Sequence, residues 1–356
     1  MTQKYNYLDF TYKLDSKGNH IVKTNPEKSE PEAIYKYYGI SINSILALEN
    51  LQLYATHPFS FNDSVDSSEL LLDFRNVSKE RFISFYKRML IPEEFSKYDF
   101  NETYENDRKA NFDNFKNFVY TNFTRNIGLI SLTTIPFNIL MWSHYTNETG
   151  FVIEFDTKKL LDDIKSQNND INNYCFRPIQ YVDNLEFIDA FSADFNTPDI
   201  PFLYATTIKR KEWEYENEWR LSIYKDDMDI PFSVLYPGSK DYKGKNNRFF
   251  KYSKDTLESI SLGKHFFNGK NCESLDNDDG IVFKLQKRMD EKYKAMDEIF
   301  IKLVNLLYEK YNDILYMSGE IEEGNKLLRS LGKIELEKID DRTFKLIDLK
   351  RVIKKN

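Results

Sequence analysis

The stretch GLISLTTIPFNILMWSHYTNETGFVIEFD, residues 128–156, holds two apolar runs that alternate as β-strands do, with a polar and aromatic segment between them. In the first run, Ser131 and Thr133 alternate with aliphatic residues, so hydroxyl and aliphatic side chains fall on opposite faces of a strand. The second run, at 151–156, alternates in the same way. A simple hairpin does not need the sequence Met-Trp-Ser-His-Tyr at 141–145, and this connection is therefore a candidate functional segment.

The composition predicts a globular protein without strong electrostatic attraction to nucleic acid. Of 356 residues, 41% are hydrophobic and 15% aromatic, which is enough for a packed core, and the net charge of −7 argues against nucleic-acid binding by bulk charge. Two cysteines are too few for a disulfide framework or a cysteine-based zinc site. The N-terminus has no signal-peptide pattern, and no apolar run reaches the roughly 20 residues of a membrane span, so we expect a cytoplasmic protein that does not enter a membrane.

The hydrophobic pattern divides the chain into an N-terminal arm at 1–33, a main domain at 34–265 and a C-terminal helical appendage at 285–356. In the main domain, strand-like runs alternate with helical patterns, and apolar residues at helical spacing predict a helical insert at about 68–123. The predicted fold is therefore α+β, with a mixed, mostly antiparallel sheet, the helical insert and a long C-terminal helix.

The C-terminal appendage is predicted to contain one long amphipathic helix at 285–317. Its apolar positions recur every three or four residues, at Met289, Tyr293, Met296, Phe300, Leu303, Leu307, Tyr311 and Ile314. Such a stripe packs either against its own domain or against a second copy of the chain in a homo-oligomer, and the sequence leaves both open. Residues 198–211 predict a further helix, and 333–353 predict a hairpin.

A charged pattern, Glu-x-Glu-x-Arg, opens a later strand-like run. If residues 216–224 form a strand, Glu216, Glu218 and Arg220 share one face, with Trp219 on the other. A solvated strand face with an exposed ion pair would explain the pattern without any function. The neighbouring aromatic residues favour an enclosed segment instead, and charged groups in an enclosed segment indicate a site.

Four motifs in order give the first resemblance. The sequences Tyr-Lys-Tyr at 35–37, Phe-Asn-Asp at 61–63, Trp-x-His-Tyr at 142–145 and Glu-x-Glu-x-Arg at 216–220 resemble those of a large bacterial family of unknown function. The resemblance covers about residues 34–265. It implies no established activity.

A second resemblance is to the ADP-ribosyltransferase fold of bacterial toxins. It rests on the order of three strands, which carry a basic residue, Lys36, then Ser131 with Thr133, then Glu216 with Glu218. Where that fold usually has Arg or His, this chain has Lys36. The resemblance implies an NAD-consuming ADP-ribosyltransferase or NAD glycohydrolase, acting as a toxin-like or anti-phage defence effector on a protein or nucleic-acid target.

The resemblance implies that Glu218 stabilises the oxocarbenium-like ribose formed when nicotinamide leaves, and that Glu216 orients the acceptor. His144 is a candidate general acid or base, and Tyr145 a candidate stacking or hydrogen-bonding group. The alternative for His144 and Tyr145 is a turn cap and a core aromatic. The contacts expected for NAD as substrate come from Lys36, Ser131, Thr133, Trp142 and Arg220, although β-propensity alone also explains the Ser-x-Thr pattern.

Two other classes of function remain open from the sequence. A metal-dependent nuclease would use Asp63, Asp66, Glu216 and Glu218 as oxygen ligands of magnesium, whereas the preferred NAD chemistry needs no metal. The 62–66 segment also fits an ordinary turn ordered by its own side chains. A non-enzymatic sensor would bind a small ligand in the Trp/His/Tyr pocket and use the C-terminal helix for assembly.

Overall fold

The computed structural model describes residues 4–7, 10–14, 20–24, 28–167, 171–190, 199–225, 228, 247–277 and 280–352. An 11-stranded sheet runs through the molecule in the order β16-β17-β20-β19-β18-β15-β8-β4-β7-β13-β9. Within it β15 and β18 pair in parallel, and the other neighbouring strands pair antiparallel. The predicted α+β class with a mixed, mostly antiparallel sheet is confirmed.

The centre of this sheet is the part that positions the candidate site. Its strands are β4 (Ala33–Tyr38), β7 (Ile127–Thr133), β8 (Phe151–Asp156), β9 (Ile171–Pro178), β13 (Glu218–Lys225) and β15 (Leu257–Leu262). Strand β4 pairs with β8 along its whole length, but with β7 only where Tyr35 lies opposite Thr133. The sheet is therefore split between β4 and β7, whereas β7 and β13 pair continuously from Thr133 opposite Glu218 to Ile127 opposite Tyr224.

The N-terminal residues form a small sheet and a capped helix before the main strands continue. Strands β1 (Lys4–Tyr7), β2 (Phe10–Leu14) and β3 (His20–Thr24) are antiparallel. Helix α1 (Ile42–Glu49) follows β4, and Ser41 caps it in a reciprocal arrangement with Ser44, which satisfies two otherwise unpaired backbone groups. Strand β5 (Gln52–Tyr54) then pairs with β14 (Phe249–Lys251).

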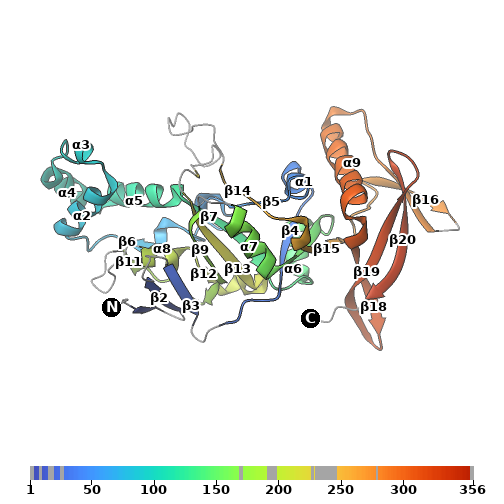
Figure 1. The fold of residues 1–356 in the computed structure, drawn as a ribbon, viewed down its shortest axis with the longest axis horizontal. Helices are drawn as coiled ribbons and strands as arrows, with labels where there is room; N and C mark the ends of the chain where they lie inside the picture. Colours follow the sequence, from blue (N-terminus) through green and yellow to red (C-terminus); the bar gives the residue numbers. More distant parts are fainter. Residues whose placement is uncertain are drawn as a thin grey trace.

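The helical insert predicted at about 68–123 corresponds in the structure to α2 (Lys79–Met89), α3 (Pro92–Phe95), α4 (Phe100–Lys109) and α5 (Asp113–Arg125). These helices lie at the opposite end of the molecule from α9 (Figure 1). Before them come the 3₁₀ turns Pro58–Ser60 and Glu69–Leu71 and the short strand β6 (Leu72–Asp73). The helices α2–α5 have an aromatic core of their own, centred on Phe82 and Phe115, whose rings lie 4.6 Å apart.

The segments on either side of β8 carry the remaining elements of the main part. They are α6 (Ile139–Met141), a π-helix (Trp142–Thr146), α7 (Thr157–Gln167), β10 (Gln180–Val182), β11 (Ile188–Asp189), α8 (Asp199–Ala205), β12 (Ile208–Arg210) and a 3₁₀ helix (Lys211–Glu216). The helix predicted at 198–211 is too long, because residues 208–210 pair with β10 instead. Glu216 ends the 3₁₀ helix and is not in the strand, since Asn217 has a left-handed φ of 42° that breaks the extended run before Glu218.

The C-terminal part is largely β-structure, contrary to the predicted helical appendage. It contains β16 (Cys272–Asn277), β17 (Gly280–Leu285), α9 (Glu291–Tyr311), a 3₁₀ turn (Asn312–Ile314), β18 (Leu315–Glu323), β19 (Lys326–Lys338) and β20 (Thr343–Val352). The predicted helix at 285–317 is shortened at both ends, because Leu285 pairs with Cys272 and residues from Leu315 pair with β15. The hairpin predicted at 333–353 corresponds to β19 and β20.

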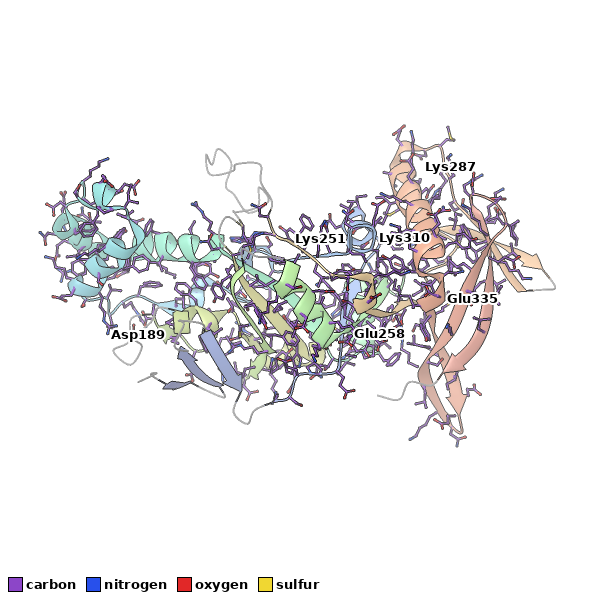
Figure 2. The ribbon with its side chains drawn as sticks, in the orientation of Figure 1. Asp189, Lys251, Glu258, Lys287, Lys310 and Glu335 are labelled. Atoms are coloured by element: carbon purple, nitrogen blue, oxygen red, sulfur yellow. The ribbon has the colours of Figure 1, made fainter. Side chains whose placement is uncertain are left out.

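Helix α9 uses only part of its apolar stripe for packing. Phe300, Leu303 and Leu307 are buried in the same core as the central strands, whereas Met296 is 52% exposed. Figure 2 shows Lys287 and Lys310 near the two ends of this helix and Glu335 on the strand β19 beside it. Core packing within the chain therefore accounts for the buried part of the stripe. Among the described residues, no helix has the length and apolar character needed to cross a bilayer.

Gly150, just before β8, allows a close backbone approach to Tyr38 at the end of β4. A Cβ at this position would lie 2.0 Å from the carbonyl oxygen of Tyr38, far inside van der Waals contact. We expect Gly150→Ala to lower the free energy of unfolding by about 1–3 kcal/mol or more through overpacking. Urea denaturation measures this loss. Gly269→Ala is the matched control, because a Cβ there meets no atom within 4 Å; equal losses in the two variants would contradict the prediction.

Candidate functional site

A cavity of about 440 Å³ lies at the split between β4 and β7. Strands β4, β7 and β13, the π-helix, the loop after β5 and the segment before β13 contribute to its wall. The lining residues are Tyr35, Lys36, Tyr37, Thr56, Ser60, Phe61, Asn62, Ser131, Leu132, Thr133, Met141, His144, Tyr145, Lys209, Glu216 and Glu218. Every predicted site residue except Trp142 and Arg220 belongs to this lining.

Arg220 lies behind the cavity and is fully buried. Its Nε and Nη2 donate to the Glu218 carboxylate at 2.7 and 3.1 Å, and its Nη1 and Nη2 donate to Asp66 at 2.8 and 2.9 Å. Nη1 also donates to the Ser67 hydroxyl and to the carbonyl of Thr206. All five N–H groups of the guanidinium are therefore used within the protein, and Arg220 acts on the cavity by holding Glu218.

Lys209 links three carboxylates at the cavity wall. Its ammonium lies 2.7 Å from Glu216, 2.7 Å from Glu218 and 3.2 Å from Asp66, and all four side chains are buried. Burial lowers the pKa of Lys209, but the three nearby carboxylates outweigh that effect, so the pKa is raised. Sequence analysis gave Lys209 no role. Lys209 follows an apolar segment and begins the basic run Lys-Arg-Lys at 209–211, and such a run alone does not distinguish a site from a solvated strand end.

The same network sets different protonation behaviour for the two glutamates. Burial raises the pKa of Glu218, but the charges and hydrogen bonds of Arg220 and Lys209 prevail and lower it to about 2. For Glu216, burial is the stronger effect and raises the pKa despite Lys209. Glu218 is thus a fixed anion at neutral pH, whereas Glu216 is the carboxylate more able to take up a proton.

Lys36 bridges the split in the sheet. Its ammonium donates to the backbone carbonyl of Ser131 on β7 at 3.0 Å, where β4 and β7 have no ladder pairing. Burial lowers the pKa of Lys36 to about 8, and the negative charge of Glu218 opposes this shift. The cation of β4 and the carboxylate of β13 therefore face the same cavity.

Ser131 and Thr133 share a strand face but make different contacts. Thr133 donates its hydroxyl to the backbone carbonyl of Glu216 at 2.6 Å, which fixes the segment that carries this glutamate. The hydroxyl of Ser131 is buried in the cavity wall and has no hydrogen-bond partner among the described residues. An unpaired buried hydroxyl is costly, and a ligand hydroxyl would satisfy it.

His144 and Tyr145 are presented to the cavity by the π-helix Trp142–Thr146. Single π-turns often occur at functional sites because they shift side chains relative to a regular helix. Nδ1 of His144 lies 3.1 Å from the Tyr215 hydroxyl. Tyr145 donates a short hydrogen bond to Glu216, and burial, together with this carboxylate, raises the pKa of Tyr145, so the phenol stays protonated.

Trp142, the first residue of the π-helix, has a fully buried side chain that does not line the cavity. Its indole N–H donates to the carbonyl of Pro136 at 2.8 Å, and its ring meets Tyr37 edge to face at 5.4 Å. The contacts of Trp142 are therefore those of a core residue that fixes the position of the π-helix.

The acidic loop residues considered as magnesium ligands separate in the structure. Asp63 accepts a hydrogen bond from the backbone N–H of Val65 at 3.0 Å, which is the turn predicted for this segment. Asp66 is bound by Arg220 and Lys209 instead. In the part of the chain that the structure describes, no group of three His, Cys, Asp or Glu side chains is arranged to hold a metal ion.

Replacing Arg220 tests the energetic role of this network. Arg220→Met would leave the buried carboxylates of Asp66 and Glu218 to share the single charge of Lys209 with Glu216, and removing one partner of a buried ion pair costs about 3–5 kcal/mol. We expect a loss of this size in the free energy of unfolding measured with urea. Arg75→Met is the control, since Arg75 also pairs with a carboxylate, Asp73, but is exposed, and we expect little change from it. A similar small change for Arg220→Met would refute the assignment.

Comparison with known proteins relates the middle of the chain to one family. Residues 141–221 match the model of a family described as protein of unknown function (DUF2971). The matched stretch begins at the π-helix and ends just after the Glu-x-Glu-x-Arg sequence, so it contains His144, Tyr145, Glu216 and Glu218. No curated protein and no solved structure matches the chain. The match supports an uncharacterised family for this stretch.

Proposed function

We propose that the cavity binds NAD and cleaves its bond between nicotinamide and ribose, as an ADP-ribosyltransferase or an NAD glycohydrolase does. The supporting observation is convergence: Lys36 on β4, Ser131 on β7 and Glu218 on β13 come from neighbouring strands and line one cavity. The resemblance to toxin-type ADP-ribosyltransferases required these three parts to meet. The order of the three strands along the sequence does not by itself bring these residues to one cavity.

The charge of Glu218 fits the first chemical step. When the bond between ribose and nicotinamide breaks, its electron pair stays on the pyridine nitrogen, nicotinamide leaves as a neutral molecule, and positive charge develops on the ribose. Glu218 remains ionised at neutral pH because Arg220 and Lys209 hold it. A fixed anion beside the ribose stabilises this charge without having to reorganise.

Glu216 and Tyr145 fit the second step. Water or a target nucleophile then adds to the ribose carbon and must release a proton. The raised pKa of Glu216 makes it the more suitable proton acceptor of the two glutamates. The Tyr145 hydroxyl donates to one oxygen of Glu216 and Lys209 binds the other, so the carboxylate has a defined orientation toward the acceptor.

Binding of the substrate is assigned to the remaining lining groups. The unpaired Ser131 hydroxyl can bond a ribose hydroxyl, and the Lys36 ammonium is a cation for a phosphate. Tyr35, Tyr37 and Phe61 supply aromatic surface to the same wall, which suits a planar ring. A cavity with a few polar groups set among aromatic side chains is typical of a small-ligand site.

The geometry favours this reaction over a magnesium-dependent nuclease. The ammonium of Lys209 lies among Asp66, Glu216 and Glu218, where a metal would have to be, and Asp63 is in a separate turn. A role as a cytoplasmic toxin-like or anti-phage defence effector, with a protein or nucleic acid as the modified target, follows from the same resemblance.

Nicotinamide release is the direct test. We expect the purified wild type, incubated with NAD and with cell extract as a source of target, to release nicotinamide, and Glu218→Gln to reduce the rate by at least roughly 100-fold, as expected for the loss of a transition-state charge. Liquid chromatography of nicotinamide measures this rate. Absence of release by the wild type, with extract and without it, would exclude the reaction, and ligand-induced stabilisation without turnover would then favour a sensor.

Ser131→Ala separates loss of chemistry from loss of folding in the same assay. Because the Ser131 hydroxyl has no hydrogen-bond partner in the part of the chain that the structure describes, its removal should not lower the melting temperature. One lost hydrogen bond to ribose should reduce kcat/KM by about tenfold. Ser222→Ala is the control, as Ser222 is a buried serine on the neighbouring strand outside the cavity lining. Equal activity of the two variants would remove Ser131 from the binding site.

The titration of Lys36 predicts how NAD affinity depends on pH. Its pKa of about 8 means that Lys36 is an ammonium below pH 8 and a neutral amine above it. Affinity for the NAD phosphates should therefore be constant below pH 7 and about tenfold weaker at pH 9 than at pH 7. Isothermal titration with a carbocyclic NAD analogue that cannot lose nicotinamide measures this change. Lys36→Met should bind weakly at every pH, and a pH dependence retained in this variant would contradict the assignment.

A further inference from the structure

Arg329 on β19 contacts both ends of the π-helix from outside the cavity. Its guanidinium lies over the ring of Trp142, the first residue of the π-helix, at 5.1 Å from the ring centre. The same group binds the carboxylate of Glu148, two residues beyond the π-helix, through two hydrogen bonds of 3.1 and 2.5 Å. Its Nε donates to the Ser318 hydroxyl on β18, which fixes the arginine itself.

The backbone that leaves the π-helix needs such support. Asn147 and Glu148 both have left-handed φ values, 52° and 58°, which cost energy in residues other than glycine. The carbonyl of Glu148 accepts a hydrogen bond from the His265 N–H at 3.0 Å, and a Cβ on Gly263 would approach this carbonyl within 2.3 Å. Backbone contacts therefore hold the main chain of Glu148, while Arg329 holds its side chain.

We infer that Arg329 is a positioning residue for the candidate reaction, which fixes His144 and Tyr145 at the cavity by holding Trp142 and Glu148 on either side of them. The inference rests on the proposed function for its catalytic consequence. Arg329 does not line the cavity, so it acts through the π-helix. It is also supplied by a strand far outside the stretch matched by the family model.

The planar shape of arginine is essential to this role. One flat group stacks on the indole with its face and binds both carboxylate oxygens with its edge, whereas a lysine ammonium is a point charge that cannot do both. Arg329→Lys therefore tests the geometry with the charge retained. Glu148→Ala breaks the same pair from the other side and leaves the C-terminal strands unchanged.

Two measurements on the full-length chain test the inference. In hydrogen exchange, we expect the amides of Asn147 and Glu148, which donate to Ser143 and Trp142, to exchange at least about tenfold faster in Arg329→Lys and in Glu148→Ala. In the nicotinamide-release assay, we expect kcat to fall about 10- to 100-fold with a smaller change in KM, because Tyr145 and Glu216 move out of register with bound substrate. Lys326→Met, an exposed cation on the same strand, should change neither measurement.

The outcomes separate a positioning role from a purely structural one. Unchanged exchange at residues 142–148 in both variants, or equal effects from Lys326→Met, would overturn the inference. Faster exchange with kcat and KM unchanged would also overturn it, because the π-helix would then be held without consequence for the reaction. If the wild type releases no nicotinamide, the proposed reaction fails, and the exchange at Asn147 and Glu148 still decides whether Arg329 holds the π-helix.

Discussion

The bidentate contacts of Arg220 with Asp66 and Glu218 are the interaction on which the candidate site depends. Burying a guanidinium is expensive unless every N–H finds an acceptor, and here two carboxylates, a hydroxyl and a carbonyl accept them all. The acceptors come from the loop before the α2–α5 helices and from the segment before β12, as well as from β13 itself. Satisfying one buried cation thus fixes the relative positions of three distant segments around the cavity.

This arrangement also separates the charges that face a ligand from the charges that support them. Arg220, behind the cavity, and Lys209, in its wall, hold Glu218, so this carboxylate is ionised and oriented before any ligand arrives. Preorganised charge of this kind is the main source of electrostatic stabilisation in enzyme sites. Glu216 is held by the weaker combination of Lys209 and Tyr145, and burial can therefore shift its proton affinity upward.

Local patterns identified seven of the sixteen residues that line the cavity, and for those on strands the alternation determines which side chains share a face. Ser131 was found in this way, whereas Glu216 was placed correctly in the lining but wrongly in the strand, since one left-handed residue, Asn217, is not visible in an alternation pattern.

Trp142 and Arg220 were predicted as ligand contacts because both belong to conspicuous motifs. Which motif residues face a cavity and which face the core depends on tertiary packing, as the burial of both side chains demonstrates. Strand β18 was missed because the apolar stripe of α9 continues without a break into residues that pair with β15, whereas the hairpin of β19 and β20 was predicted.

The split between β4 and β7 explains why the cavity depends on more of the chain than its own motifs. An open sheet leaves backbone groups unpaired at the point of separation, and Lys36 compensates by donating to the carbonyl of Ser131 across it. The β4 side of the split is supported through β8 and β15, and β15 pairs with β18 of the C-terminal part. The strand next to β18 supplies Arg329, which holds the π-helix over the same opening. The last residue of the cavity lining in the sequence is Glu218. Residues after 315 nevertheless act on the geometry of the cavity, because the sheet continues without a break from β4 to the C-terminal strands.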